Sequence, residues 1–279
     1  MPELPEVETI ACGVDARVRG DQIVEAWFGS HREPFKTPAA RQAKGLEGST
    51  ILAVHRTGKH IVCELGPGTA RSSFLEESAA APTAQWIVHL GMTGRLQVCE
   101  PQAEILKHTH AILKLASGRE LRFVDPRRFG RLSVARGFDA SGIEPLEADL
   151  DRFLAMFRGR KTPIKSALLN QKLLRGVGNI YADESLFRAG IRPRRRASTI
   201  TRDQLATLLA SVKEVLREAI ALGGSSISDY VDPDGEEGFF QLQHRVYARE
   251  GEPCLVCKTA IKRIVIAGRS SHYCPKCQK

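Results

Sequence analysis

The sequence has no long hydrophobic run, and this absence excludes one class of protein. None of its segments approaches the roughly 18 uninterrupted apolar residues that a membrane-spanning helix needs. The N-terminus is acidic and has neither the basic nor the apolar region of a signal peptide. We therefore expect a cytosolic protein rather than a membrane or secreted one.

The sequence also has fewer acidic residues than basic ones. The 279 residues include 41 Lys and Arg against 32 Asp and Glu, which leaves a net charge of +9 and a pI near 9.3. Such an excess favours a polyanionic partner, and nucleic acid is the most economical choice. The length suits two domains, and 42% hydrophobic residues are sufficient to fill their cores.

Cysteine is limited to seven residues, and in a cytosolic chain their placement argues against a disulfide framework. Two Cys-x2-Cys pairs are separated by sixteen residues and contain Cys254, Cys257, Cys274 and Cys277. Two such pairs complete a closed tetrahedron around zinc, which leaves no position for a catalytic water. We predict one structural Zn²⁺ and no redox or nucleotide cofactor. The other three cysteines, Cys12, Cys63 and Cys99, are expected to be small buried hydrophobic residues.

Residues 261–269, between the two cysteine pairs, are typical of a β-hairpin with a basic tip. This hairpin is too short to hold a core of its own without metal. It is either an element that contacts DNA or a zinc-stabilised tail whose charges are only solvated, and the finger alone does not decide between them.

The second residue of the chain carries the most chemical information. Removal of the initiator methionine would leave Pro2 with a free secondary amine. An α-amino group has a pKa of about 7.7–8.0, against about 10.4 for lysine, so part of it is neutral and nucleophilic at pH 7. Glu3 supplies a carboxyl for proton transfer. Pro5, Glu6 and Glu8 are instead interpreted as a helix start, with Pro5 at the first helical position and the carboxylates complementing the helix dipole.

The first half of the chain has the pattern of antiparallel β-structure. Residues 50–65 and 86–99 are rich in Val and Ile, and residues 111–115 and 121–124 flank a Ser-Gly turn. Residues 57–60 form a predicted hairpin turn that would project Lys59 from the end of a strand pair, although a turn lysine is commonly only solvated. Residues 66–85 break the pattern and indicate a surface loop.

The second half has a helical period that starts near residue 150, after a linker at 137–149. A helix is predicted from the Thr162-Pro163 cap through about Gln171, and the glycine turn 176–179 leads into another helix. This turn and helix N-terminus form either an anion site suited to phosphate or an ordinary helical hairpin. Residues 201–222 form an amphipathic helix with a Thr201/Gln204 capping box, and the loop 224–238 could serve as a lid.

Six segments, in order along nearly the whole chain, resemble the formamidopyrimidine-DNA glycosylases. They are the PELPE start, Lys59 in its turn, residues 89–94 (HLGMTG), residues 125–130 (DPRRFG), residues 176–179 (GVGN) and the four-cysteine finger. The resemblance implies an α+β fold with an N-terminal β-sandwich and a C-terminal helix-two-turn-helix domain that carries a zinc-finger hairpin. The expected divisions are 1–136, a linker at 137–149, 150–243 with a lid loop, and 244–279.

The resemblance also implies an activity. It is the excision of oxidised purines, such as 8-oxoguanine and formamidopyrimidines, followed by cleavage of the abasic strand by β,δ-elimination. The implied partner is damaged double-stranded DNA, bound by a monomer. Leu4 favours this branch over the endonuclease VIII enzymes, which prefer oxidised pyrimidines. An endonuclease VIII-like preference and a catalytically silent damage-binding protein are the alternatives.

By position, the resemblance assigns roles to individual residues. Pro2 is the implied nucleophile, Glu3 its acid/base, and Lys59 and Arg269 the proton donors of the first and second eliminations. The implied DNA-holding residues are His108, Arg127, Arg160, Lys165, Asn179 and Tyr247. The implied wedge, which fills the space of the flipped-out nucleotide, consists of Met92, Arg127 and Phe129. Without the resemblance, Met92 and Phe129 would be interpreted as ordinary β-domain core.

Overall fold

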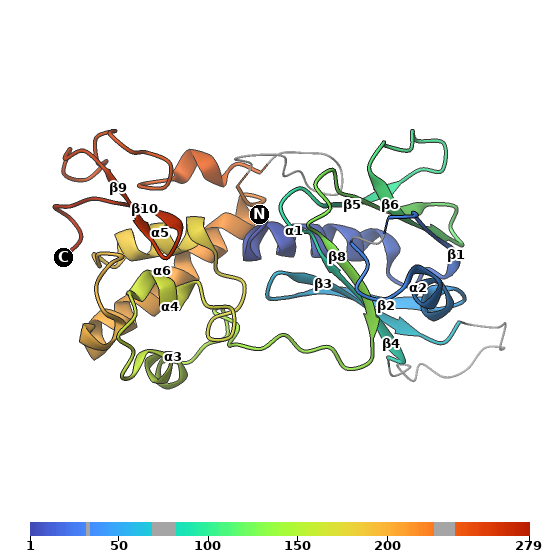
Figure 1. The fold of residues 1–279 in the computed structure, drawn as a ribbon, viewed down its shortest axis with the longest axis horizontal. Helices are drawn as coiled ribbons and strands as arrows, with labels where there is room; N and C mark the ends of the chain where they lie inside the picture. The colour runs from blue at the N-terminus through green and yellow to red at the C-terminus, as the bar shows by residue number, and fades with distance from the viewer. Residues whose placement is uncertain (32–33, 69–81, 226–237) are drawn as a thin grey trace. The chain divides into compact units, whose positions relative to one another are not determined.

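The computed structural model describes residues 1–31, 34–68, 82–225 and 238–279 (Figure 1). They divide into two compact units. The first includes Met1–Pro2 and Glu6–Asp139, and the second includes Glu3–Pro5, Ala140–Ser225 and Phe239–Lys279. The division at 139/140 falls inside the linker expected at 137–149. Most of the expected loop at 66–85 and of the expected lid at 224–238 lies outside the described residues.

The first unit contains two four-stranded antiparallel sheets, with strand orders β2-β3-β4-β8 and β1-β6-β7-β5 (Figure 1). The predicted β-pattern and both predicted turns are confirmed. The elements are α1 (Leu4–Val18), β1 (Ile23–Phe28), α2 (Ala39–Leu46), β2 (Thr50–Thr57), β3 (His60–Gly66), β4 (Ala84–His89), β5 (Arg95–Cys99), β6 (Thr109–Leu115), β7 (Glu120–Val124) and β8 (Arg131–Ala135).

One hydrophobic core joins both sheets of this unit to helix α1. Trp86 of one sheet and Phe123 of the other are fully buried in it, together with Val7, Ile10 and Val14 of α1. The expected β-sandwich flanked by helices is therefore confirmed.

The expected burial of the three other cysteines holds for one of them. Cys63 is buried in the core of the first unit, whereas Cys99 is only partly buried. Cys12 is exposed, because it lies outside the apolar stripe of α1, and its thiol points to Glu8. The interpretation of Cys12 as a buried hydrophobe was wrong.

The second unit is mainly helical and ends in a β-hairpin. Helix α6 has the predicted capping box, its predicted apolar stripe is buried, and Gly223 and Gly224 end it with φ of 72° and 83°. The elements are α3 (Leu150–Phe157), α4 (Ile164–Leu168), α5 (Asn179–Arg188), the 3-10 helices η1 (Ala197–Thr199) and η2 (Phe240–Gln243), α6 (Arg202–Ala221), β9 (Lys262–Ile266) and β10 (Arg269–Tyr273). Within the described residues, no helix is long and apolar enough to cross a membrane.

Three helix boundaries differ from the prediction. Helix α4 ends at Leu168 rather than near Gln171, because the Asn170 side chain accepts the Lys172 N–H at 3.0 Å and closes a turn. Pro163 is the residue before this helix and not its first member. Helix α1 begins at Leu4, so that Pro5 is its second residue.

Candidate active site and metal centre

The turn between β2 and β3 holds Lys59 in a defined place. Gly58 has a φ of +60°, a conformation that favours glycine, and Lys59 is only 7% exposed. Arg56 donates to Glu8 of α1 at 2.6 Å and to the Gly58 carbonyl at 3.2 Å. One guanidinium therefore ties the lysine turn to the first helix, and the alternative of a merely solvated lysine does not hold.

Two loops of the first unit are joined by the buried carboxylate of Asp125. It accepts the Thr93 hydroxyl at 2.6 Å, the Gly130 N–H at 2.7 Å and the Arg127 N–H at 3.3 Å. Since these donors come from residues 90–94 and 126–130, a single side chain fixes both loops. Asp125 belongs to the DPRRFG motif, but the motif alone did not indicate this role.

The three expected wedge residues come together on these loops. Gly91 has a φ of +67°, and a Cβ there would lie 2.5 Å from the Gly130 nitrogen, so only glycine allows the loops to pack this closely. Met92 is 42% exposed and Phe129 is 53% exposed, which excludes the core alternative for both. The Arg127 guanidinium lies 4.8 Å from the centroid of the Phe129 ring.

The wedge side chains share a hollow with the chain's first residue. This hollow, of about 320 Å³, is lined by Met1, Met92 and Phe129, together with His60, His89, Gly91 and Arg131. Met1 is 48% exposed, and the next residue, Pro2, is buried. The expected nucleophile is thus adjacent in sequence to a residue that lines the wedge hollow.

A pair of neutral histidines forms the wall of this hollow. His60 and His89 face each other across β3 and β4 with ring centroids 5.0 Å apart. Burial, reinforced by His60 and Lys59, lowers the pKa of His89 to about 4. Its Nδ1 accepts the Gly91 N–H at 3.2 Å, an arrangement that requires this nitrogen to carry no proton.

In the second unit, Glu3 occupies the N-terminus of helix α5. Its carboxylate is nearly buried, 4% exposed, and accepts the Ile180 N–H at 3.0 Å and the Tyr181 N–H at 3.5 Å. A Cβ at Gly178 would lie 2.3 Å from the Glu3 carboxyl carbon, so the glycine turn makes room for this carboxylate. Of the two alternatives for this turn, the anion site agrees with the structure, but the anion at these two N–H groups is a carboxylate of the chain itself and not a phosphate.

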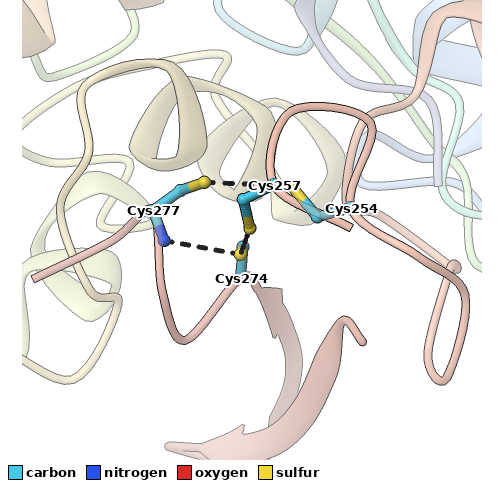
Figure 2. A group of neighbouring side chains, drawn as sticks. All are labelled: Cys254, Cys257, Cys274 and Cys277. Atoms are coloured by element: carbon cyan, nitrogen blue, oxygen red, sulfur yellow. Dashed lines mark hydrogen bonds between the residues drawn. The ribbon is translucent and has the colours of Figure 1, made fainter. Parts of the chain in front are cut away.

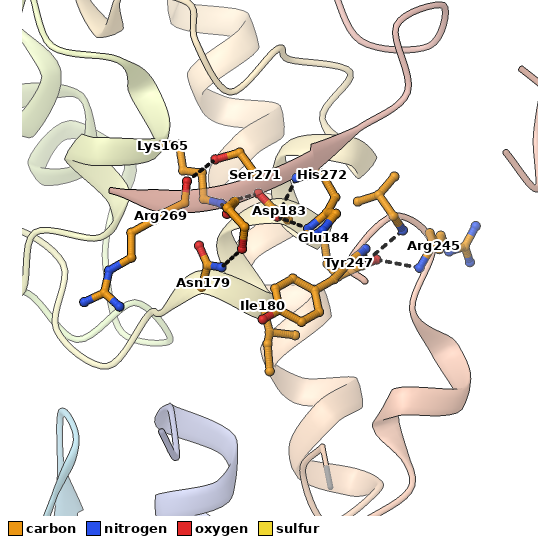
Figure 3. A network of polar contacts seen from close by, with 12 residues as sticks. Lys165, Asn179, Ile180, Asp183, Glu184, Arg245, Tyr247, Arg269, Ser271 and His272 are labelled. Carbon is orange, nitrogen blue, oxygen red and sulfur yellow. Dashed lines mark hydrogen bonds and ion pairs between the residues drawn. The ribbon is translucent and has the colours of Figure 1, made fainter. Parts of the chain in front are cut away.

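Lys165 lies at the centre of a buried polar network (Figure 3). Its ammonium is 2.7 Å from Asp183 and donates to the Ser270 carbonyl at 2.6 Å. Burial lowers the pKa of Lys165, against the opposing effect of Asp183. A fully buried, paired ammonium is not available to a phosphate, so the expected direct DNA contact of Lys165 does not agree with the structure. Lys165 instead holds strand β10.

Two adjacent carboxylates of α5 bind backbone N–H groups of strand β10 and of residues 245–247, as Figure 3 shows. Asp183 accepts the His272 N–H of β10 at 2.8 Å. Glu184 accepts three successive backbone N–H groups, from Arg245, Val246 and Tyr247, at 2.8–3.0 Å. Neither carboxylate was among the residues predicted from the sequence. The feature that distinguishes them is a pair of charged residues in a helix whose residues 181–187 are all buried. A single sequence does not reveal that this helix is buried.

The remaining expected DNA-contacting residues lie in different places. Asn179 donates to the Ser270 hydroxyl at 3.2 Å, and Tyr247 is partly buried, which raises the pKa of its phenol. Arg269 is exposed at the hairpin tip, after an Ala-Gly turn. Arg160 is partly exposed, with its Nε directed to the Met156 carbonyl. His108 is exposed and belongs to the first unit.

The four cysteines of the finger form a metal site (Figure 2). Their sulfur atoms all lie within 4.8 Å of one another, with 3.4 Å between Cys257 and Cys274 and 3.9 Å between Cys254 and Cys277. Zn–S bonds of about 2.3 Å in a tetrahedron place sulfurs about 3.8 Å apart, so the donor set and its size fit Zn²⁺. The predicted structural zinc site is confirmed.

Removal of zinc should unfold the finger and spare the first unit. Without metal, four thiols on a two-stranded hairpin have no core to hold them. Chelation should expose residues 262–269 to trypsin, and added Zn²⁺ should restore protection. Tryptophan emission should stay constant, because Trp27 and Trp86 both lie in the first unit. A hairpin that resists trypsin after the metal is removed would contradict this assignment.

His89 should make the first unit less stable in acid. Its pKa is about 4 in the folded protein, against about 6.5 when unfolded. Between these values the unfolded chain binds more protons, so lowering the pH from 7 to 5 should cost about 2 kcal/mol. His89→Asn retains an acceptor for Gly91 but does not titrate. Its free energy of unfolding, measured in urea and followed by tryptophan emission, should therefore not show this decrease between pH 7 and pH 5. The matched control is His108→Asn, an exposed side chain. An unchanged pH dependence in His89→Asn would exclude His89 as its source.

Comparisons with known proteins cover both units and the finger. Residues 1–132 match the model of the formamidopyrimidine-DNA glycosylase N-terminal domain. Residues 142–231 match that of the formamidopyrimidine-DNA glycosylase H2TH domain. Residues 251–279 match the zinc finger found in FPG and IleRS.

Full-length relatives agree with these matches. The formamidopyrimidine-DNA glycosylases of Solibacter usitatus and Thioalkalivibrio sulfidiphilus are 45% and 40% identical, each over 100% of both chains. Among solved structures, a Lactococcus lactis FPG variant in complex with Fapy-dG-containing DNA has a TM-score of 0.87 at 32% identity, covering 100% of both chains. The Fpg protein of Thermus thermophilus has a TM-score of 0.84 at 39% identity, covering 99% of this chain and 98% of that one. The chain therefore belongs to the formamidopyrimidine-DNA glycosylase family.

Proposed function

We propose that the protein is a base-excision repair enzyme that removes oxidised purines from double-stranded DNA and then nicks the abasic strand. The observation that carries this proposal is the hollow in which Met1, Met92 and Phe129 meet, because it joins the N-terminus to exposed groups that can replace a base. The Lactococcus relative bound to Fapy-dG-containing DNA supports the substrate class. The enzyme acts as a monomer in the cytoplasm, at the nucleoid.

The chemistry begins at Pro2 after Met1 has been removed. The neutral amine attacks the sugar C1′, and the damaged base leaves with the electrons of its glycosidic bond and takes up a proton. Glu3, which follows directly in the chain, protonates the ring oxygen as the sugar opens. The result is an iminium between Pro2 and C1′.

The iminium then drives strand cleavage. It withdraws electrons, so a proton can leave C2′ while the 3′ phosphate departs, and a second elimination expels the 5′ phosphate. Lys59 donates the proton of the first elimination and Arg269 that of the second. The burial of Lys59 and its anchored turn support a defined donor position.

The wedge compensates for base flipping. Extrusion of a nucleotide costs a few kcal/mol of unstacking. Met92, the Arg127 guanidinium and the Phe129 ring fill the vacated space, and their loops are fixed in advance by Asp125. Since the loops need little rearrangement, more of the contact energy remains for holding the flipped state.

Affinity comes from the DNA backbone. His108, Arg127, Arg160, Asn179 and Tyr247 hold phosphates and sugars, which gives binding without sequence preference. Lys165 contributes indirectly, because it holds the strand that begins with Arg269.

One observation favours a wider substrate range. A Lactococcus lactis relative has also been solved with DNA that contains an oxidised pyrimidine. Oxidised pyrimidines are therefore a second candidate substrate class.

Borohydride should trap the protein on lesion DNA through residue 2, because reduction turns the iminium into a stable amine. The chain beginning at Pro2 should excise and trap on 8-oxoguanine and formamidopyrimidine duplexes, more slowly on an oxidised pyrimidine, and not on undamaged DNA. A chain that retains Met1 has an amide at this nitrogen, so it should bind DNA without excision or trapping. Lys59→Met should still trap. A crosslink mapped to a lysine would refute Pro2 as nucleophile, and binding without excision by the processed chain would indicate a silent damage-binding protein.

Phe129→Ala should weaken discrimination rather than background binding. Loss of one stacking ring should lower affinity for a lesion duplex about tenfold, with a much smaller change for undamaged duplex, because the wedge inserts only where a nucleotide is flipped. Competition binding with both duplexes measures the difference. The matched control is Ile105→Ala, which removes an exposed apolar side chain that does not line the wedge hollow. Equal losses on both duplexes would remove Phe129 from the wedge.

A further inference from the structure

A second hollow of the first unit has no role in the chemistry above. It encloses about 400 Å³ where β1 ends and β6 begins, and Trp27, His31, Lys107, His108 and Arg128 lie in its wall. A volume of this size suits a ligand as large as one nucleotide.

Trp27 is the unusual member of this wall. The chain has two tryptophans, and the other, Trp86, is fully buried in the core. Trp27 lies on the edge strand β1, opposite Ile112 of β6, and is 45% exposed. An indole ring held half in solvent on a rigid strand is a ready surface for stacking a planar ligand.

The charged side chains that line this hollow are of one sign. Lys107 and Arg128 are cations, His31 and His108 add imidazole rings, and the hollow's described lining contains no carboxylate. Cations beside an exposed aromatic ring are the arrangement of single-strand nucleic-acid sites, where the cations hold the phosphates and the ring stacks on a base.

Arg128 connects this hollow to the wedge loop. Its φ of +58° is rare for a residue other than glycine, and strain of this kind persists where the surroundings impose it. Arg127 stacks on Phe129, whereas the Arg128 guanidinium lies 3.4 Å from His31 in the wall of the second hollow. Of these two adjacent arginines, one side chain thus lies on the wedge and the other in the wall of the second hollow.

We propose that this second hollow, the Trp27 subsite, binds one unpaired nucleotide of the DNA beside the wedge. The base stacks on Trp27, and its phosphate is held by Lys107, His108 and Arg128. Bases inside an intact duplex are already stacked and cannot reach the ring, so the ligand is a single-stranded or unstacked nucleotide. A bare phosphate would use the cations but leave the indole without a partner. The inference rests on the proposed function, since it concerns the same DNA.

Tryptophan emission tests the subsite directly. A short oligo-dT should quench the Trp27 emission and protect it from acrylamide, whereas Trp86 is inaccessible to acrylamide from the start. A base-free deoxyribose-phosphate oligomer of equal length and charge should bind more weakly and leave the emission nearly unchanged. Trp27→Leu should weaken oligo-dT binding about fivefold, the low end of what one stacked base contributes. Trp27→Phe should retain part of it.

Controls separate this inference from the proposed function. Val24→Ala removes another exposed side chain of β1 and should bind oligo-dT normally. Trp27→Leu should excise a lesion from the middle of a blunt duplex at the wild-type kcat. Equal quenching by the base-free oligomer, or oligo-dT binding without quenching, would overturn the subsite while leaving the proposed function intact. Quenching in a protein that excises nothing would overturn the proposed function alone.

Discussion

The second unit depends on the compensation of negative charge buried around helix α5. Glu3 at its N-terminus, with Asp183 and Glu184 in its middle, brings carboxylates into a region where an unpaired charge would be prohibitively costly. Backbone N–H groups and the Lys165 ammonium satisfy them. These bonds also fix three segments distant in sequence: the chain start, residues 245–247 and strand β10. The same pairs that make burial tolerable therefore position the groups proposed to act on DNA.

In the first unit, polar side chains also fix segments that are distant in sequence, but here those segments carry exposed side chains. Asp125 gathers the loops that carry Met92, Arg127 and Phe129, and Arg56 joins the Lys59 turn to α1. Close backbone approach at Gly91 completes the arrangement. These loops present large apolar side chains to solvent, which costs free energy in the isolated protein. In the proposed function, contact with DNA covers these side chains and recovers that free energy. Trp27, in the wall of the neighbouring hollow, is likewise a large apolar side chain exposed to solvent.

The burial of a histidine makes the stability of the first unit depend on pH. His89 remains neutral because charge in its pocket would be desolvated beside Lys59 and His60. Its unprotonated nitrogen accepts the N–H of Gly91, directly before Met92. The protonation state of one side chain is thus coupled to the loop that carries part of the wedge.

The sequence by itself determined the features whose physics is local. Strand alternation, the capping box of α6, the glycine turns and the spacing of four cysteines depend on neighbours within a few residues, and the structure agrees with each of them. Only the tertiary structure decided which charges are buried and what they bind. It placed the Glu3 carboxylate at the helix N-terminus that the glycine turn left open as a phosphate site, enclosed Lys165 with Asp183, and left Cys12 and Trp27 exposed. Burial is set by contacts between segments far apart in the chain, and no local pattern in one sequence specifies which segments those are.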